Sequence, residues 1–172
     1  MPFLGFIWYM TLYYILFVVG IIALVLALVL LIWPRFTAVV PAYAGMLCLH
    51  LSTFIYLRSF TLIFWGVAAA IVLMLKYMSP KGEPDGHSES NLYVGLSTIA
   101  GAMLGLVISP SLIVLGAIIG SLIGVMAYSR TPRGKWINPP SAAFFQYVGT
   151  KCLPAVVTVS IVGITVEGFI FY

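Results

Sequence analysis

Charged side chains are scarce in this sequence. Of its 172 residues only 7% are Asp, Glu, Lys or Arg, whereas 63% are hydrophobic. Because a soluble domain carries about 25% charged residues, this scarcity excludes a soluble protein and predicts an integral membrane protein. The apolar stretches run almost from end to end and leave no room for a soluble domain. We therefore expect a single membrane domain over residues 1–172.

Motifs that carry catalysis are also missing. The sequence has no Gly-x-Ser-x-Gly elbow and no phosphate-binding loop that ends in Lys-Ser/Thr. Acidic residues cluster only in the hydrophilic stretch 79–90, and Cys48 and Cys152 lie in apolar surroundings typical of small buried side chains. We expect no enzyme, no cofactor and no metal site, although a membrane enzyme that pairs His50 with a distant serine stays open.

Six apolar segments, separated by prolines or polar residues, predict an all-α membrane protein of about six transmembrane or re-entrant helices. At 1.5 Å per residue, the first segment crosses a hydrocarbon core of about 30 Å. The fourth and fifth segments are at the short limit for spanning, so they either cross fully or form a re-entrant pair. Pro154 is expected to kink the sixth segment or to separate an interfacial start from a spanning remainder. The predicted helices cover about 12–32, 42–57, 60–77, 92–108, 112–128 and 142–172.

Positive charges are distributed unevenly between the two sides of this predicted topology. One side holds only Arg58, and the other holds every other Lys and Arg. Because cytoplasmic loops of membrane proteins carry the excess of Lys and Arg, we expect the basic side in the cytoplasm and both termini outside it. The net charge of +4 then reflects membrane topology rather than nucleic-acid binding. The basic side comprises Arg35, Lys76, Lys81, Arg130, Arg133, Lys135 and Lys151.

Two ladders of small residues, spaced every four positions, occupy the fourth and fifth segments. Four residues are close to one helical turn, so each ladder lines one helix face. Small faces let two helices in lipid approach closely, and close packing drives their association. We expect a central glycine-zipper hairpin, packed within the chain or against a neighbouring subunit; a pore lining is the alternative. The ladders are Ser97, Gly101 and Gly105, and Gly116, Gly120 and Gly124.

Three ionisable residues are candidate polar functional groups. His50 lies midway along the second segment, Arg58 follows that segment, and Glu167 is the only acidic residue inside an apolar run. Ionisable groups inside a membrane are expensive and mark functional sites by default. Two of them also have a purely structural interpretation, His50 as a neutral packing histidine and Glu167 as a residue at the outer interface.

The order of parts in the chain resembles that of a known family. An apolar helix leads into a proline-flanked break, WPRFTAVVPAYAGMLCLHLS, and a further helix ends in LMLKYMSP. A glycine-rich pair follows, GLSTIAGAMLGLVISPSLIVLGAIIGSLIGVMAYS, and then a basic stretch and a last apolar segment. From about residue 14 onward this order resembles the small bacterial membrane-protein family catalogued as domain of unknown function 456. The resemblance implies a bacterial cytoplasmic-membrane location and supplies no catalytic or ligand residues.

Two classes of function agree with these observations. The first is a non-enzymatic accessory or scaffold protein that assembles through glycine packing, as a homo-oligomer or within a larger membrane complex. The second is a small transporter or channel with a path near 92–108 and 112–128, whose polar groups would be His50, Arg58 and Glu167. Transporters often use short, Gly/Pro-interrupted segments, but they usually carry several polar groups inside the membrane. Because this chain has few such groups, we expect the accessory role.

Overall fold

The regular structure of the chain is entirely helical in the residues that the structure describes, which agrees with the predicted all-α class. The computed structural model describes residues 2–32, 37–53, 55, 57–78, 88–132, 134–135, 137 and 141–171. Three stretches are long and apolar enough to cross a membrane: Trp8–Ile32, Ser59–Met78 and Phe144–Ile170. These spans support the prediction of a membrane protein.

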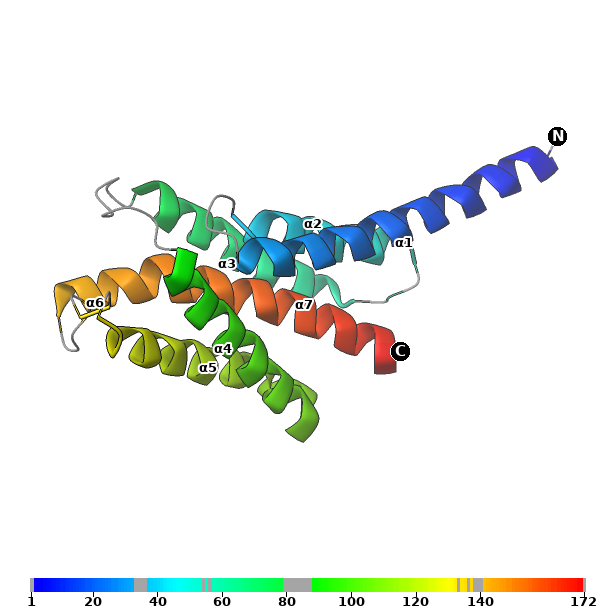
Figure 1. Ribbon diagram of the computed structural model, residues 1–172. Coiled ribbons are helices and arrows are strands. Elements are labelled where there is room, and N and C mark those ends of the chain that lie inside the picture. The colour runs from blue at the N-terminus through cyan, green and yellow to red at the C-terminus, as the bar shows by residue number, and fades with distance from the viewer. Residues whose placement is uncertain are drawn as a thin grey trace.

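Helices α1 (Pro2–Ile32) and α2 (Val39–Leu51) lie side by side at one edge of the bundle (Figure 1). Helix α1 begins well before the predicted start at residue 12, because the apolar run upstream contains no proline after Pro2. Proline suits the first position of a helix, where its missing N–H is not needed and its fixed φ is already helical.

The prediction for the second helix, 42–57, is wrong at both ends. Helix α2 includes Pro41 in its first turn, where backbone N–H groups have no partner within the helix and proline is tolerated. The helix ends at Leu51, because Thr53 has a φ of 59°, in the left-handed region that stops an α-helix. Ser52 closes the end by donating its hydroxyl to the carbonyl of Leu49, at 2.6 Å.

The middle of the chain follows the prediction closely. Helix α3 covers Ser59–Met78 and helix α4 covers Ser88–Ile108. A single 3₁₀ turn, η1 (Pro110–Leu112), then leads into α5 (Ile113–Ser129). Proline cannot continue α4 because it lacks the N–H that a helix interior requires, and so the chain reverses at this point.

The sixth predicted helix, 142–172, is divided by a π-helical turn. Helix α6 (Ala142–Tyr147) runs through the π turn η2 (Val148–Cys152) into α7 (Leu153–Phe171). Pro154 explains the location of the π turn, because a proline inside a helix removes one hydrogen bond and its ring clashes with the carbonyl four residues earlier. Widening the preceding turn by one residue relieves that clash, as π-bulges in α-helices do.

Helix α7 is the central element of the bundle and contacts each of α1 to α5 (Figure 1). One side of α7 packs with α1, α2 and α3 through Val157 and Ile161. Another side packs with α4 and α5 through Ala155 and Val159. The apolar core is therefore divided into two clusters that meet at α7.

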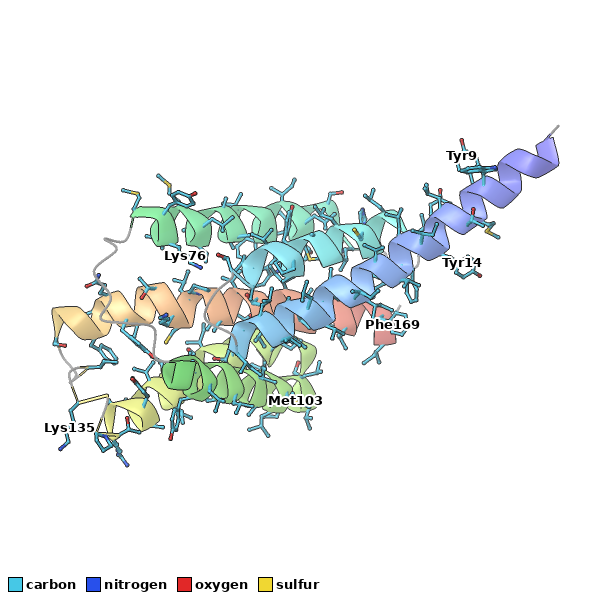
Figure 2. All side chains as sticks on the ribbon, turned by 45° about the horizontal axis from the view of Figure 1, so that its top comes forward. Tyr9, Tyr14, Lys76, Met103, Lys135 and Phe169 are labelled. Atoms are coloured by element: carbon cyan, nitrogen blue, oxygen red, sulfur yellow. The ribbon has the colours of Figure 1, made fainter. Side chains whose placement is uncertain are left out.

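The ends of the bundle differ in chemistry. Figure 2 shows Lys76 and Lys135 at one end, and Tyr9 and Tyr14 toward the opposite end. At the basic end, Lys76 Nζ donates a hydrogen bond of 2.7 Å to Thr37 Oγ1. The location of this end in the cytoplasm stays a prediction. Three of the basic residues counted above lie outside the described part of the chain: Arg35, Lys81 and Arg133.

Candidate functional site

The two small-residue ladders lie against each other along the contact between α4 and α5. A Cβ atom placed on Gly101 would lie 2.9 Å from Gly120 Cα, and one placed on Gly120 would lie 3.1 Å from Gly101 Cα. Similarly, a Cβ on Gly116 would lie 3.2 Å from Gly105 Cα, and one on Gly124 would meet the hydroxyl of Ser97. The contact is therefore one of backbone against backbone, with no space for a side chain between the ladders.

The ladder contact has a consequence for both predicted functions. Each ladder faces the other one within the same chain, so neither is available to a neighbouring subunit in this structure. The same closeness leaves no room for a path between the two ladder faces.

A second close contact between glycines joins α1 and α2. A Cβ on Gly45 would lie 2.9 Å from the carbonyl oxygen of Gly20, and one on Gly20 would lie 2.6 Å from Leu49 Cγ. This pair was not predicted from the sequence, because neither glycine belongs to a ladder of small residues at four-residue spacing. The only available signal was a single glycine in each of two neighbouring apolar segments, 12–32 and 42–57.

A pocket of about 630 Å³ lies between the start of α3, the start of α5 and the end of α7. It contains two of the three predicted polar residues, Arg58 and Glu167, and two hydroxyl-bearing residues, Thr61 and Ser111. Arg58 is exposed and Glu167 is half-buried. The third predicted residue, His50, lies in the last turn of α2 and is not among the residues that line this pocket.

The charges in the pocket are poorly matched to the helix ends that carry them. Arg58 directly precedes α3, and the N-terminus of a helix carries a partial positive charge. Glu167 lies near the end of α7, where the partial charge is negative. Each side chain therefore has the same sign as its own helix end, an arrangement that an oppositely charged group in the pocket would stabilise.

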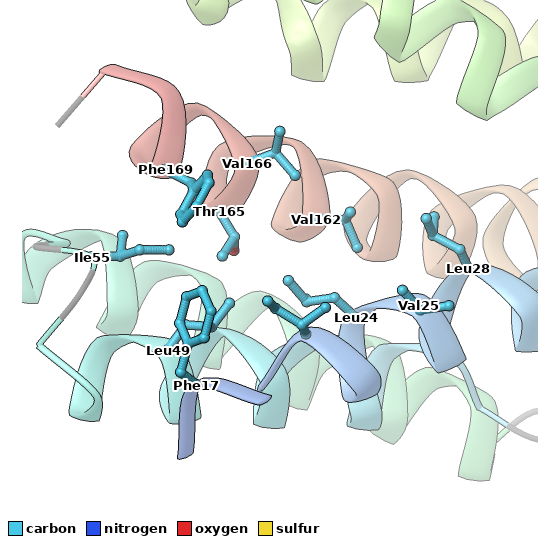
Figure 3. A pocket seen from close by; sticks show the side chains of 11 residues that line it. Phe17, Leu24, Val25, Leu28, Leu49, Ile55, Val162, Thr165, Val166 and Phe169 are labelled. Atoms are coloured by element: carbon cyan, nitrogen blue, oxygen red, sulfur yellow. The ribbon is translucent and has the colours of Figure 1, made fainter. Parts of the chain in front are cut away.

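An apolar groove of about 220 Å³ lies on the other side of the C-terminal part of α7, where α7 meets α1 and α2 (Figure 3). Figure 3 shows Phe17 and Leu24 of α1 facing Val162 and Phe169 of α7 across it. Ile55 and Leu57 pack over Gly168, where a Cβ would lie 3.0 Å from Ile55 Cγ2. The segment between α2 and α3 thus separates the apolar groove from the charged pocket.

Helix α7 carries two buried hydroxyls that were not predicted from the sequence. Thr158 Oγ1 and Ser160 Oγ have no hydrogen-bond partner in the part of the chain that the structure describes. Other buried hydroxyls bond to carbonyls of their own helix: Thr98 to Val94 at 2.6 Å and Thr165 to Ile161 at 2.7 Å. Nothing in the spacing of Thr158 and Ser160 distinguished them from such self-satisfied residues.

The cysteines and acidic residues do not gather into a site within the described ranges. Cys48 and Cys152 are free thiols in different helices, and Cys152 is buried. No three His, Cys, Asp or Glu side chains among the described residues are grouped closely enough to hold a metal ion.

Comparison with models of known families, with curated proteins and with solved structures finds no match to this chain. The charged pocket is therefore interpreted from its own geometry and chemistry.

Proposed function

We propose that this chain is a non-enzymatic polytopic membrane protein that serves as an accessory or scaffold subunit of a membrane complex. The observation that supports this role is the length of α1. Helix α1 has 31 residues, whereas α3, which is long enough to span a bilayer, has 20. In Figure 1 the N-terminal part of α1 extends beyond the rest of the bundle.

The excess length of α1 creates a mismatch with the bilayer. At 1.5 Å per residue α1 is about 46 Å long, against a hydrocarbon core of about 30 Å. Tilting alone would require an angle of about 50°, beyond the usual range of 0–40°. Because the overhanging part exposes Trp8 and Tyr9, packing against another helix is a favourable way to cover it.

The side of α1 that faces away from the bundle is suited to such packing. Five β-branched residues, at alternating spacings of three and four, line this outer face, and each is half or more exposed. Their spacing is that of a helix–helix seam, and β-branched side chains lose little rotamer freedom when they pack. The outer face of α1 consists of Ile15, Val18, Ile22, Val25 and Val29; Val25 stands at the edge of this face and also lines the apolar groove toward α7.

The proposed assembly surface differs from the one expected from the sequence. In this proposal the glycine ladders form the rigid internal frame of the subunit, and the outer face of α1 makes the contact with a second copy or with another membrane protein. The resemblance to domain of unknown function 456 and a bacterial cytoplasmic-membrane location agree with this role and belong to the same proposal.

Affinity purification from native membranes, followed by mass measurement of the purified species in mild detergent, tests the accessory role. We expect a complex of defined stoichiometry, which Ile22→Trp dissociates because the indole ring prevents close approach at the seam. The matched control is Ile63→Trp, which changes an exposed isoleucine of α3. The proposal would be contradicted if the wild-type protein, Ile22→Trp and Ile63→Trp were all purified as monomers.

A small transporter or channel is the second candidate, and the charged pocket is the observation that favours it. Ser111 of the turn η1 and Val114 at the start of α5 line the same pocket as Arg58 and Glu167. The path would then begin beside the turn between α4 and α5 rather than between the ladders. Solute flux in proteoliposomes that Arg58→Gln abolishes would favour transport over the accessory role.

A further inference from the structure

The charged pocket contains two opposite charges that do not neutralise each other. Arg58 and Glu167 both line it, yet no ion pair or side-chain hydrogen bond engages either of them within the described part of the chain. We propose that the pocket binds a zwitterion that carries a phosphate and an ammonium group. Phosphoethanolamine has this chemistry, either as a phospholipid headgroup or in a water-soluble ester. The proposal depends on neither of the two candidate functions.

The anionic half of such a ligand fits the start of α3. An arginine guanidinium binds phosphate through two parallel hydrogen bonds, and Arg58 stands immediately before the first turn of the helix. Backbone N–H groups in that turn have no partner within the helix and favour an anion. The hydroxyl-bearing Thr61 lines the same part of the pocket. A phosphate here would relieve the repulsion between Arg58 and the positive end of α3.

The cationic half fits the end of α7. Glu167 supplies a carboxylate there, and the partial negative charge of the helix C-terminus acts in the same direction. Three aromatic residues, Phe60, Phe64 and Trp65, also line the pocket, and the rings of Phe64 and Trp65 meet edge to face with centroids 5.4 Å apart. Aromatic faces attract ammonium groups. The ammonium would therefore have both a charged partner and aromatic partners.

A buried polar group lies below the charged pocket, on the same face of α7. Ser160, Ile164 and Glu167 share one face of α7, since they are spaced by four and three residues. Ile164 and Glu167 line the pocket, and Ser160, about two turns deeper, is fully buried with an unpartnered hydroxyl. The polar character of this face of α7 therefore extends below the pocket.

The level of the pocket in the membrane agrees with a headgroup ligand. Helix α3, with 20 residues, is about as long as the hydrocarbon core is thick. Its first residues therefore lie at the boundary with the headgroups, and Arg58 lies just outside it. A volume of about 630 Å³ is typical of small-molecule sites. It is larger than the space that a direct contact between Arg58 and Glu167 would require.

Lipid binding to the delipidated full-length protein tests this assignment. The probes are phosphatidylethanolamine, which has both charged groups, and phosphatidylglycerol, which has only the phosphate. We expect phosphatidylethanolamine to bind about tenfold more tightly, as one additional charged contact provides. Glu167→Gln should lower its affinity to that of phosphatidylglycerol and leave phosphatidylglycerol binding unchanged, whereas Arg58→Gln should weaken both lipids. Arg130→Gln, an exposed arginine outside the pocket, should change neither.

A second variant protects the test against misfolding. Phe64→Leu keeps the apolar character of the pocket but removes an aromatic ring, so it should lower phosphatidylethanolamine affinity about threefold without affecting phosphatidylglycerol. Competition by soluble glycerophosphoethanolamine distinguishes the two possible sources of the ligand, a phospholipid headgroup and a water-soluble ester. Displacement of the lipid indicates a soluble ligand, and no displacement indicates a headgroup held with its lipid; both outcomes support the proposal. Equal affinity of the wild-type protein for the two lipids, or a preference that survives Glu167→Gln and Phe64→Leu in folded protein, would overturn it.

Discussion

Single residues determine how closely the helices of this bundle approach. The ladder glycines bring the backbones of α4 and α5 into contact, and Gly20 and Gly45 do the same for α1 and α2. In water such glycines weaken a helix by about 1 kcal/mol each. In lipid the close approach that they permit gives the packing on which helix association depends.

Replacing Gly120 by alanine tests the ladder contact with one methyl group. The new Cβ would collide with the backbone of Ser97 and Gly101, and backbone cannot move aside as a flexible side chain can. We expect the free energy of unfolding to fall by about 1–3 kcal/mol, measured by denaturant titration in detergent. Gly149→Ala is the control, because a Cβ there meets nothing within 4 Å. Equal stability of the two variants would show that α4 and α5 do not pack through this face.

The unpartnered hydroxyl of Thr158 predicts a substitution that raises the stability of the protein, whereas Gly120→Ala lowers it. Valine has the same shape as threonine without the hydroxyl, and an unsatisfied buried hydroxyl costs about 1–3 kcal/mol. We therefore expect Thr158→Val to raise the unfolding temperature relative to Thr165→Val, whose hydroxyl donates to the Ile161 carbonyl. A lower unfolding temperature for Thr158→Val would mean that its hydroxyl is satisfied.

The sequence predicts some of these residues and not others, for a physical reason. Periodic spacing places Gly101, Gly105, Gly116, Gly120 and Gly124 on helix faces without reference to the rest of the fold. A pair such as Gly20 and Gly45 has no period, so its role depends on which helices become neighbours. Arg58 and Glu167 were each predicted as polar functional groups, but the pocket that they share exists only because α3 starts where α7 ends.

At the scale of elements, backbone chemistry decides where each helix begins, ends or changes pitch. Pro110 ends α4 as predicted, whereas Pro41 is accommodated in the first turn of α2. The end of α2 at Leu51 was not predictable from hydrophobicity, because the apolar run continues and the helix stops through the left-handed conformation of Thr53. The turn before Pro154 is likewise a local response to a missing N–H.

Deletion of one residue tests whether η2 contains one residue more than an α-helix requires. In a Pro154→Ala background, where the proline clash is absent, removing Gly149, which has open space beside it, should convert α6, η2 and α7 into one continuous α-helix and leave the unfolding temperature within a few degrees of that background. Removing Val156 instead would rotate the following part of α7 by about 100° and bring its buried face out of register. Similar losses of stability for both deletions would contradict a π-bulge at this position.

At the scale of the whole molecule, α7 is surrounded by α1 to α5, and apart from Arg58 the Lys and Arg residues that the structure describes do not line the charged pocket. The central position of α7 could not be predicted, because in lipid every helix is apolar on all sides and hydrophobic periodicity does not indicate which face is buried. The orientation in the membrane stays a prediction, which depends on counts of Lys and Arg rather than on packing.

Labelling of single cysteines in intact cells tests this orientation. In a background without Cys48 and Cys152, we expect Arg58→Cys to react with a membrane-impermeant maleimide added outside. Lys135→Cys should react only after permeabilisation, because the basic end is predicted to lie in the cytoplasm. The reverse pattern would invert the proposed topology.

Photo-cross-linking in native membranes tests the proposed accessory role most directly. A photoreactive amino acid at Ile15 probes the outer face of α1, and one at Ile63 of α3 is a control with similar exposure, 66% against 61%. The proposal predicts one discrete protein adduct from position 15, either a dimer of the chain or a conjugate with a single partner, and only lipid adducts from position 63. Lipid adducts alone from both positions would contradict the claim that α1 assembles this protein with another.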